Sequence, residues 1–458
     1  MSEQTSPTSP SDAHPTTPIE ASPPHTAGKA ETPLLADQSF WGMAVTQFLG
    51  AFNDNLFKQL ILLLATPVAA VVAVEGAVAA ETIKTDRQGE ATVLFALAFV
   101  IFSGFAGWLA DRTSKRTLII WSKVAEIVIM ILGMIGFFFY DVIGLPGMLF
   151  VLFLMGAQSA FFGPPKYGIL PERVKPWDLP AANGIFLMFT FVAIIFGMGL
   201  AGVLMQWVGV ENVWRASMIC VVIAVIGTLT SFMVWKVPPA APGSRFKMED
   251  LLIPRQMIDL IRGNRQLLLA LLVSSTFWML GGVVQAGVNA LGKTQLGLSD
   301  GWTSLLAAMM AVGIPVGCIV GGYLSKRRIN PRVVAAGAIG MFICLLLLAL
   351  PGGPQGHLLG FAGSIPVLLL LGFSTGMFVV PIQVSLQVLP PPEDKGRMIA
   401  VMNQCNFMGI IAGGILFKLT IAFLEMQAWP RNLVFGVTAA VMLPIVLFYR
   451  PEERSLES

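Results

Sequence analysis

Acidic, basic and amide side chains are concentrated in one short stretch of an otherwise apolar segment, with the sequence QFLGAFNDNLFKQ over residues 47–59. On a helix, Gln47, Asp54 and Lys58 lie on one stripe, and Asp54 precedes Lys58 by four residues, the order that favours an ion pair. On insertion scales an unpaired charge at the centre of a bilayer costs about 2.5–3.5 kcal/mol. We therefore expect this group to border a hydrated cavity and bind substrate, with a self-neutralising structural pair as the alternative. Its predicted binding residues are Asn53, Asp54, Asn55 and Lys58.

Neutral amides occur on two later apolar segments, and they could face the same cavity. Gln285 and Asn289 lie one helical turn apart, and Asn403 and Gln404 are adjacent in the sequence. Because neutral amides cost less to bury than charges, each of them could simply hydrogen-bond a neighbouring helix. Since they cluster on few segments, we include all four in the predicted binding site.

A hydrophilic hexapeptide, residues 111–116, separates two apolar runs that are each long enough to cross a bilayer. A short cationic connection between two spans favours the cytoplasmic side of the membrane. Asp111 could cap the amino end of a neighbouring helix and latch the inner side closed, whereas topology determination alone is the alternative. The residues alone leave both interpretations open, and the predicted residues of such an inner gate are Asp111, Arg112, Lys115 and Arg116.

Two further charges, Lys123 and Glu126, lie three residues apart just inside the second of these runs. They could brace the inner gate, extend toward the membrane surface, or contact the ligand. We group them with the gate and leave ligand contact open.

The composition determines the class of protein to which these residues belong. Of the 458 residues 55% are hydrophobic and only 12% are charged, and the mean hydropathy is +0.76. A soluble domain has about twice that share of charged residues. We predict an all-α polytopic membrane protein with twelve transmembrane helices in two pseudo-symmetric six-helix bundles. The predicted spans are 39–66, 91–110, 117–140, 146–163, 181–205, 213–236, 266–290, 301–324, 332–350, 365–388, 398–424 and 430–449.

The distribution of basic residues predicts the orientation of the chain. Most of the 29 Lys and Arg residues fall in the alternate loops that share one side with both termini. The positive-inside rule then places both termini in the cytoplasm. The net charge of +3 gives no reason to expect nucleic acid as a partner.

The chain is expected to divide into five parts. A tail rich in Pro, Ser and Thr, residues 1–38, is predicted to be disordered, and residues 451–458 form a second cytoplasmic tail. Six-helix bundles over 39–236 and 266–450 flank a cytoplasmic linker, 237–265. An amphipathic helix is expected in this linker from Met248 to Ile261. Paired halves with a site between them are typical of secondary transporters.

Cofactor chemistry finds no support in the sequence. The segment GVNALGKT, residues 287–294, fits the pattern of a phosphate-binding loop, but it lacks the preceding strand that such a loop needs. The histidines are scattered, and the four cysteines fall inside predicted spans. We therefore expect no cofactor, no metal and no enzymatic activity.

Three motifs resemble those of known transporters. The segment GWLADRTSKR, residues 107–116, resembles the signature loop of the major facilitator superfamily, with Ser114 in place of the usual glycine. The segments QFLGAFNDN (47–55) and FGPPKYGILPE (162–172), followed by ANG (182–184), are similar to the bacterial lysophospholipid transporter family. They also resemble the transporter portion of proteins fused to an acyltransferase and an acyl-carrier-protein ligase.

The resemblance implies a function that composition alone does not. It implies a secondary transporter that moves lysophospholipids, chiefly lysophosphatidylethanolamine, from the outer to the inner leaflet of the bacterial cytoplasmic membrane for reacylation. It implies membrane lipid as a partner and leaves room for a separate acyltransferase. It places Asp54 in the polar cavity, and it puts Lys166 and Tyr167 in the inner gate.

Two other functions remain open at this point. The chain could be a facilitator that exports drugs or small solutes, because a polar first span suits that cargo too. It could also be a non-transporting subunit that delivers lysolipid to an acyltransferase.

Overall fold

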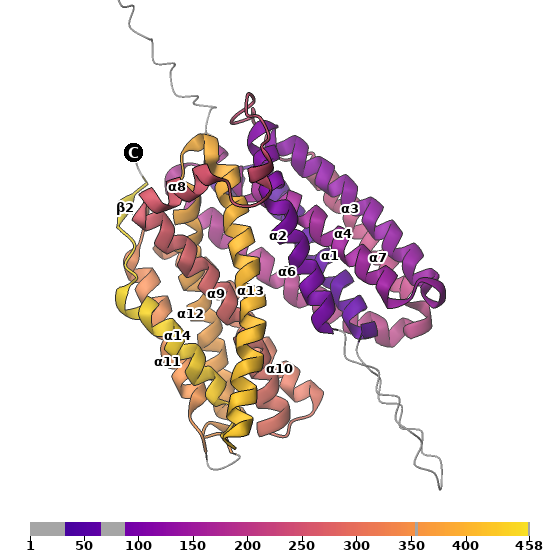
Figure 1. Ribbon diagram of the computed structural model, residues 1–458, viewed down its shortest axis with the longest axis vertical. Helices are drawn as coiled ribbons and strands as arrows, with labels where there is room; N and C mark the ends of the chain where they lie inside the picture. The colour runs from indigo at the N-terminus through magenta and orange to yellow at the C-terminus, as the bar shows by residue number, and fades with distance from the viewer. Residues whose placement is uncertain (1–32, 66–87, 353–355, 457–458) are drawn as a thin grey trace, which may run out of the picture.

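The computed structural model describes residues 33–65, 88–352 and 356–456, and these fold almost entirely into helices (Figure 1). Residues 1–32, most of the predicted disordered tail, lie outside this range. The long helices are α1 (Gln38–Ala65), α2 (Gln88–Arg112), α3 (Lys115–Phe138), α4 (Tyr140–Gly168), α6 (Leu179–Val208), α7 (Val213–Ser231), α9 (Arg265–Ala290), α10 (Asp300–Leu324), α11 (Pro331–Ala349), α12 (Gly360–Val388), α13 (Lys395–Met426) and α14 (Leu433–Phe448).

Short elements connect the long helices. They are the 3₁₀ turns η1 (Leu34–Ala36), η2 (Pro176–Asp178), η3 (Val210–Asn212), η4 (Met248–Leu251) and η6 (Pro392–Asp394), the π-helical turn η5 (Leu291–Gln295), the short helices α5 (Leu170–Arg173) and α8 (Arg255–Gly263), and two strands, β1 (Arg328–Ile329) and β2 (Arg454–Ser455). The strands pair antiparallel and attach the carboxyl end of the chain to the loop between α10 and α11.

The helices confirm the predicted class of protein. In the part of the chain that the structure describes, ten helical segments are long and apolar enough to cross a membrane. With the 28-residue α1 and the shorter apolar α14, they correspond to the twelve predicted spans. The chain is therefore an all-α, multi-pass membrane protein.

The predicted linker helix is wrong in its extent. Residues 248–251 form the separate turn η4, and α8 begins only at Arg255. Pro254 precedes α8 as its N-cap residue, and proline disfavours helical backbone at the residue before it. Met257 and Ile261 are buried as an amphipathic helix requires, whereas Leu252 is exposed.

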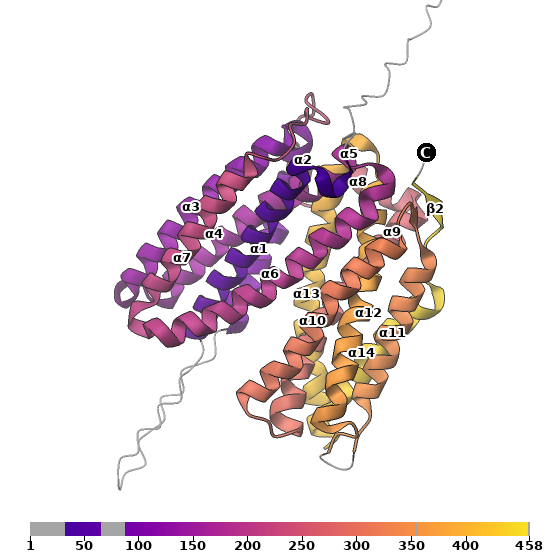
Figure 2. The ribbon, with the colours of Figure 1, turned by 180° about the vertical axis from the view of Figure 1, so that it is seen from behind.

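The two halves of the chain repeat one pattern of helix pairing (Figures 1 and 2). In the first half α1 packs on α6, α2 on α4, and α3 on α4 and α7. In the second half α9 packs on α13, α10 on α12, and α11 on α12 and α14. Each helix of the first half therefore has a counterpart in the second, as a pseudo-symmetric pair of bundles requires.

Two helix pairs carry most of the contact between the halves. We call them the α2–α13 seam and the α6–α10 seam, and they are counterparts in the repeat. In the α6–α10 seam the backbones meet closely, because a Cβ atom on Gly184 would lie 2.7 Å from the carbonyl oxygen of Cys318. In the α2–α13 seam Gly107 packs against Ala400. Figure 2 shows α6 and α10 meeting at one end and diverging toward the other.

Helices α10 and α12 make the most extensive contact in the fold, and small residues allow it. We predict that Gly317→Ala will destabilise the protein by about 1–3 kcal/mol, the usual cost of overpacking. The physical reason is that the added Cβ would lie 2.8 Å from the carbonyl carbon of Phe373. The thermal unfolding midpoint in detergent micelles measures the effect.

Gly281→Ala is the matched control, because no heavy atom lies within 4 Å of its added Cβ. Equal unfolding midpoints for the two variants would contradict the close-packing argument.

Candidate functional site

The polar residues of α1 contact different neighbours, according to the side of the helix on which they lie. Asn53 is fully buried, and its Nδ2 donates to Oε1 of Glu126 on α3 at 2.8 Å. Asp54 accepts a hydrogen bond from the hydroxyl of Ser159 on α4 at 2.6 Å. The Nδ2 of Asn55 donates to the carbonyl of Ala51 in its own helix. The segment thus joins α1 to both α3 and α4.

Lys58 lies at the other end of this group, beside aromatic rings. Its Nζ is 5.3 Å from the ring centroid of Phe95 on α2, a distance typical of a cation–π contact. Phe95 belongs to an aromatic cluster in which Phe99 stacks on Phe407 of α13 at 3.8 Å between centroids. The Lys58 ammonium therefore borders the α2–α13 seam.

Lys123 and Glu126, which we predicted inside the span 117–140 and grouped with the gate, lie with the α1 group, about two turns from the start of α3. They form an ion pair in which Lys123 is fully buried and Glu126 is 2% exposed. Gly50 of α1 and Gly227 of α7 make room for the lysine, and a Cβ atom on Gly227 would be 2.9 Å from its Nζ. The pair is placed to hold Asn53, next to Asp54, in a fixed position.

The assembled group is electrically balanced. It contains two carboxylates, Asp54 and Glu126, and two ammonium groups, Lys58 and Lys123. A charge buried without a counter-charge is costly at low dielectric, and removing one partner of a buried pair costs about 3–5 kcal/mol. One oxygen of Asp54, Oδ1, is buried without a hydrogen-bond partner in the described structure. The group therefore keeps an unfilled acceptor position.

Among the described residues, the amides predicted on the second half make no hydrogen bond to this group. In the described residues, Gln285 and Asn289 are exposed on α9 and make no hydrogen bond to α1. Gln404 instead donates to the carbonyl of Val100 at 2.7 Å, across the α2–α13 seam, and Asn403 lies against Gly163 of α4. Gln47 donates to the carbonyl of Phe186 and to Thr190, so it fastens α1 to α6.

Asp111 caps the amino end of α13, a helix of the other half. Its carboxylate oxygens accept from the backbone N–H groups of Gly396 at 2.8 Å and Arg397 at 3.0 Å. A negative charge at a helix amino terminus is stabilised by the unsatisfied N–H groups and by the helix dipole. Its own carbonyl accepts from Ala241 in the linker. We refer to this side of the molecule as the Asp111 end.

The other predicted gate residues surround this contact. Arg112 donates to the carbonyl of Ser244, and Arg116 to that of Phe232. Lys115 is buried and pairs with Glu172 at 2.5 Å. Lys166 lies over the ring of Tyr167, with its Nζ 4.4 Å from the centroid.

Sequence reasoning missed two sets of residues. Ser159 could have been found, because it is a polar residue inside an apolar span and is thus the same kind of signal as Asp54. Asn183 and Gln387 form two reciprocal hydrogen bonds, of 2.7 and 2.9 Å, between α6 and α12. Their partnership joins the two halves and carries no local sequence signal.

Neither the phosphate-loop pattern nor a metal site is realised in the described structure. Residues 287–294 continue α9 into the turn η5, with no strand before them. All four cysteines are free. No cluster of His, Cys, Asp and Glu that could hold a metal ion occurs in the described ranges.

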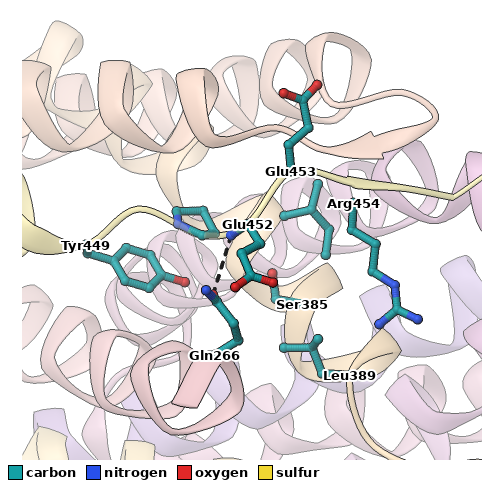
Figure 3. Close-up of a pocket in the computed structure, with 9 residues that line it drawn as sticks. Gln266, Ser385, Leu389, Tyr449, Glu452, Glu453 and Arg454 are labelled. Carbon is teal, nitrogen blue, oxygen red and sulfur yellow. Dashed lines mark hydrogen bonds between the residues drawn. The ribbon is translucent and has the colours of Figure 1, made fainter. Parts of the chain in front are cut away.

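A pocket of about 230 Å³ lies at the Asp111 end of the second half, beneath the carboxyl-terminal strand (Figure 3). Tyr449, directly after α14, and Gln266 of α9 line it, and the chain from Glu452 to Arg454 closes it. None of the predicted binding residues lines it.

Known proteins resemble this chain along most of its length. The sequence pattern of the Major Facilitator Superfamily matches residues 43–414. The lysophospholipid transporter LplT of Pectobacterium carotovorum subsp. carotovorum (strain PC1) is 30% identical over 385 residues, which cover 81% of this chain and 84% of that protein. LplT of Salmonella arizonae is 28% identical over 420 residues, 89% of this chain and 95% of that protein.

Solved structures show the same fold. FucP, a transporter of the superfamily in its outward conformation, matches with a TM-score of 0.66 at 18% identity, over 89% of this chain and 97% of FucP. The proton:xylose symporter XylE matches with a TM-score of 0.64 at 14% identity, over 92% and 98% of the two chains. Because the superfamily pattern and a relative at 30% identity both extend over most of this sequence, the chain belongs to the Major Facilitator Superfamily and, within it, to the family of the lysophospholipid transporters.

Proposed function

We propose that this protein moves lysophospholipids, lysophosphatidylethanolamine foremost, from the outer to the inner leaflet of the bacterial cytoplasmic membrane. The proposal is based on the balanced group of charges around α1, in a chain whose relatives are lysophospholipid transporters. The transported lysophospholipids would then be available in the inner leaflet for reacylation by a separate acyltransferase. As a member of a transporter superfamily, the chain is a transporter and not an enzyme.

The charges of this group suit a zwitterionic lipid headgroup. An ammonium group could fill the open acceptor position on Asp54, and a phosphate could bind Lys58. The contact between Lys58 and Phe95 is worth about 0.5–2 kcal/mol, so a charge-assisted bond to phosphate could replace it. A sugar or a neutral drug would leave one or both charges without a partner.

Alternating access is the proposed mechanism, with the bundles 39–236 and 266–450 as the moving units. The halves are joined at the Asp111 end by the cap on α13 and by the Asn183–Gln387 pair. If this end is cytoplasmic, as the basic loops indicate, the described state is closed inward. Opening at this end would have to release the Asn183–Gln387 pair between the halves.

We predict that Asp54→Asn and Lys58→Gln will change the selectivity for cargo in different ways. Asp54→Asn should slow the transport of lysophosphatidylethanolamine about 10- to 100-fold, because a hydrogen bond to a charged group is worth about 1.5–3 kcal/mol. It should affect lysophosphatidylglycerol little, since that lipid has no ammonium. Lys58→Gln should slow both lipids. Uptake of radiolabelled lipids into proteoliposomes measures these rates.

Asn55→Ala serves as the comparison. Although the sequence predicts Asn55 as a binding residue, among the described residues it bonds only to its own helix, so we expect this variant to keep both rates. An Asp54→Asn variant that transports lysophosphatidylethanolamine at the native rate would remove Asp54 from the proposed site. Failure of the native protein to transport either lipid in liposomes would favour a delivery subunit or a different cargo.

We propose that Lys123 and Glu126 position Asn53 and do not act as a gate. Lys123→Met alone should destabilise the protein by about 3–5 kcal/mol, because it leaves Glu126 as an uncompensated buried charge. Lys123→Met combined with Glu126→Gln should be less destabilised than the single variant. Thermal unfolding in detergent gives the comparison, and a double variant less stable than the single one would contradict the pairing.

Asp111→Asn should loosen the α2–α13 seam at the Asp111 end. An amide offers a single acceptor oxygen and no charge to the N–H groups of Gly396 and Arg397, so a cysteine at the buried position 400 should react faster with maleimide. We expect about a tenfold increase or more, from the loss of about 1.5–3 kcal/mol. Asp178→Asn, at the same end, is the control, and equal labelling in both variants would refute the latch.

A further inference from the structure

We propose that the linker between the halves is a strap that keeps the α2–α13 seam closed at the Asp111 end, so that lipid passes between site and membrane at that end through the α6–α10 seam. The proposal rests on the proposed function, because it assumes that the two halves move relative to each other. The two seams are counterparts in the internal repeat, but the linker crosses only one of them.

One face of α2 is exposed over part of its length and covered over the rest. Val93, Leu97 and Ile101 lie on one stripe and are exposed by 49%, 41% and 40%, as expected of side chains that face lipid. Gly104 and Trp108 continue the same stripe toward the Asp111 end. Trp108 is only 8% exposed, so another part of the protein covers the stripe there.

The linker is the segment that covers it. A Cβ atom on Gly104 would lie 2.7 Å from the carbonyl carbon of Leu251, so the turn η4 rests directly on the α2 backbone. The ring of Phe246 lies 5.2 Å from the rings of both Phe105 and Trp108. Near the end of α2, Arg112 donates to the carbonyl of Ser244 at 2.8 Å. These contacts form the first anchor of the strap.

The second anchor lies on the other half. Gln256 donates to Asp394, in the turn η6 that leads directly into α13, at 3.2 Å. Met257 and Ile261 are buried in the core of the second half. Figure 1 shows the linker running from the end of α2 to α8 in front of α13. The strap thus crosses the α2–α13 seam on its outer side.

The strap is too short to allow this seam to open widely. Only residues 252–255 separate Leu251 on α2 from Gln256 at α13. Five residue steps span at most about 17 Å when fully extended, and packed helix axes are already about 8–10 Å apart. To part the helices enough for an acyl chain, η4 would have to leave α2 and expose Phe246.

Among the described residues, no segment that connects the two halves crosses the α6–α10 seam, although Leu456 near the carboxyl end is buried with residues of the first half. Gly184 and Gly322 bring the two backbones together, and the N–H of Arg327 donates to the carbonyl of Trp177 at 3.1 Å. These contacts can separate without stretching a connecting chain. The asymmetry therefore assigns the lateral opening at the Asp111 end to α6–α10.

Spin-label distances across each seam test the proposal. In a cysteine-free background reconstituted in nanodiscs, Thr113→Cys with Glu393→Cys reports the α2–α13 seam, and Asp178→Cys with Lys326→Cys reports the α6–α10 seam. With lysophosphatidylethanolamine added, we expect the second pair to gain a longer distance and the first pair to keep its single distance. Equal lengthening of both pairs would overturn the strap while leaving alternating access intact. If neither pair lengthens, alternating access fails, and the strap proposal fails with it.

Two changes to the linker make the test specific. Inserting six Gly and Ser residues after Ile253 adds slack without removing a contact, and it should give the Thr113–Glu393 pair a longer distance. Phe246→Ala should act in the same direction by weakening the anchor on α2. Met248→Ala is the control, because Met248 is 76% exposed in the same linker. A Thr113–Glu393 distance that stays unchanged in both linker variants would contradict the restraint.

Discussion

The need to partner buried charges constrains this structure more than any other interaction. Lys123 and Glu126 lie wholly inside the first bundle, and each makes the burial of the other tolerable. Glu126 also accepts from Asn53, which fixes the side of α1 on which Asp54 and Lys58 lie. Glycines on α1 and α7 supply the space that the lysine occupies. The backbone spacing of three helices therefore follows from one ion pair.

The contacts between the halves are distributed by depth. At the Asp111 end they are polar and directional, with a carboxylate on helix N–H groups and a reciprocal pair of amides. Deeper in the molecule aromatic contacts lie beside the Gln404–Val100 hydrogen bond, because Phe95 and Phe99 both contact Phe407. Polar contacts can be exchanged for water when the halves separate, whereas aromatic contacts exclude it. Such an order suits a gate that opens at the end of the molecule.

The helices were predictable from sequence because a membrane permits few solutions. A backbone in lipid must satisfy its own hydrogen bonds, so each long apolar run has to become a helix. The predicted spans are found as the long helices among α1 to α14, that is, all but α5 and α8. The capping contact of Asp111 was also predictable, since a helix amino terminus favours a nearby carboxylate. The linker helix was overextended because hydrophobic periodicity outweighed the effect of Pro254 in that prediction.

Partner choice was less predictable than position. Lys123 was grouped with the gate because it is close in sequence to residue 116. In the structure it lies on the face of α3 that is directed toward α1, where it pairs with Glu126. Gln285 and Asn289 share a helical face that is exposed on α9, and among the described residues neither hydrogen-bonds to the charges on α1. These outcomes depend on helix rotation within a bundle, which packing decides and local sequence does not encode.

The internal repeat is symmetric in helix pairing but not in charge. The first helix of the first half, α1, carries Asp54 and Lys58, whereas its counterpart α9 offers the neutral residues Trp278 and Gln285. A charged headgroup would therefore gain most of its binding energy from one half alone. Such a headgroup would remain with the first bundle while the second moves past it. The opening and closing of the seams would then depend on how the second bundle moves, and the linker from Leu251 to Gln256 restrains that movement on one side only.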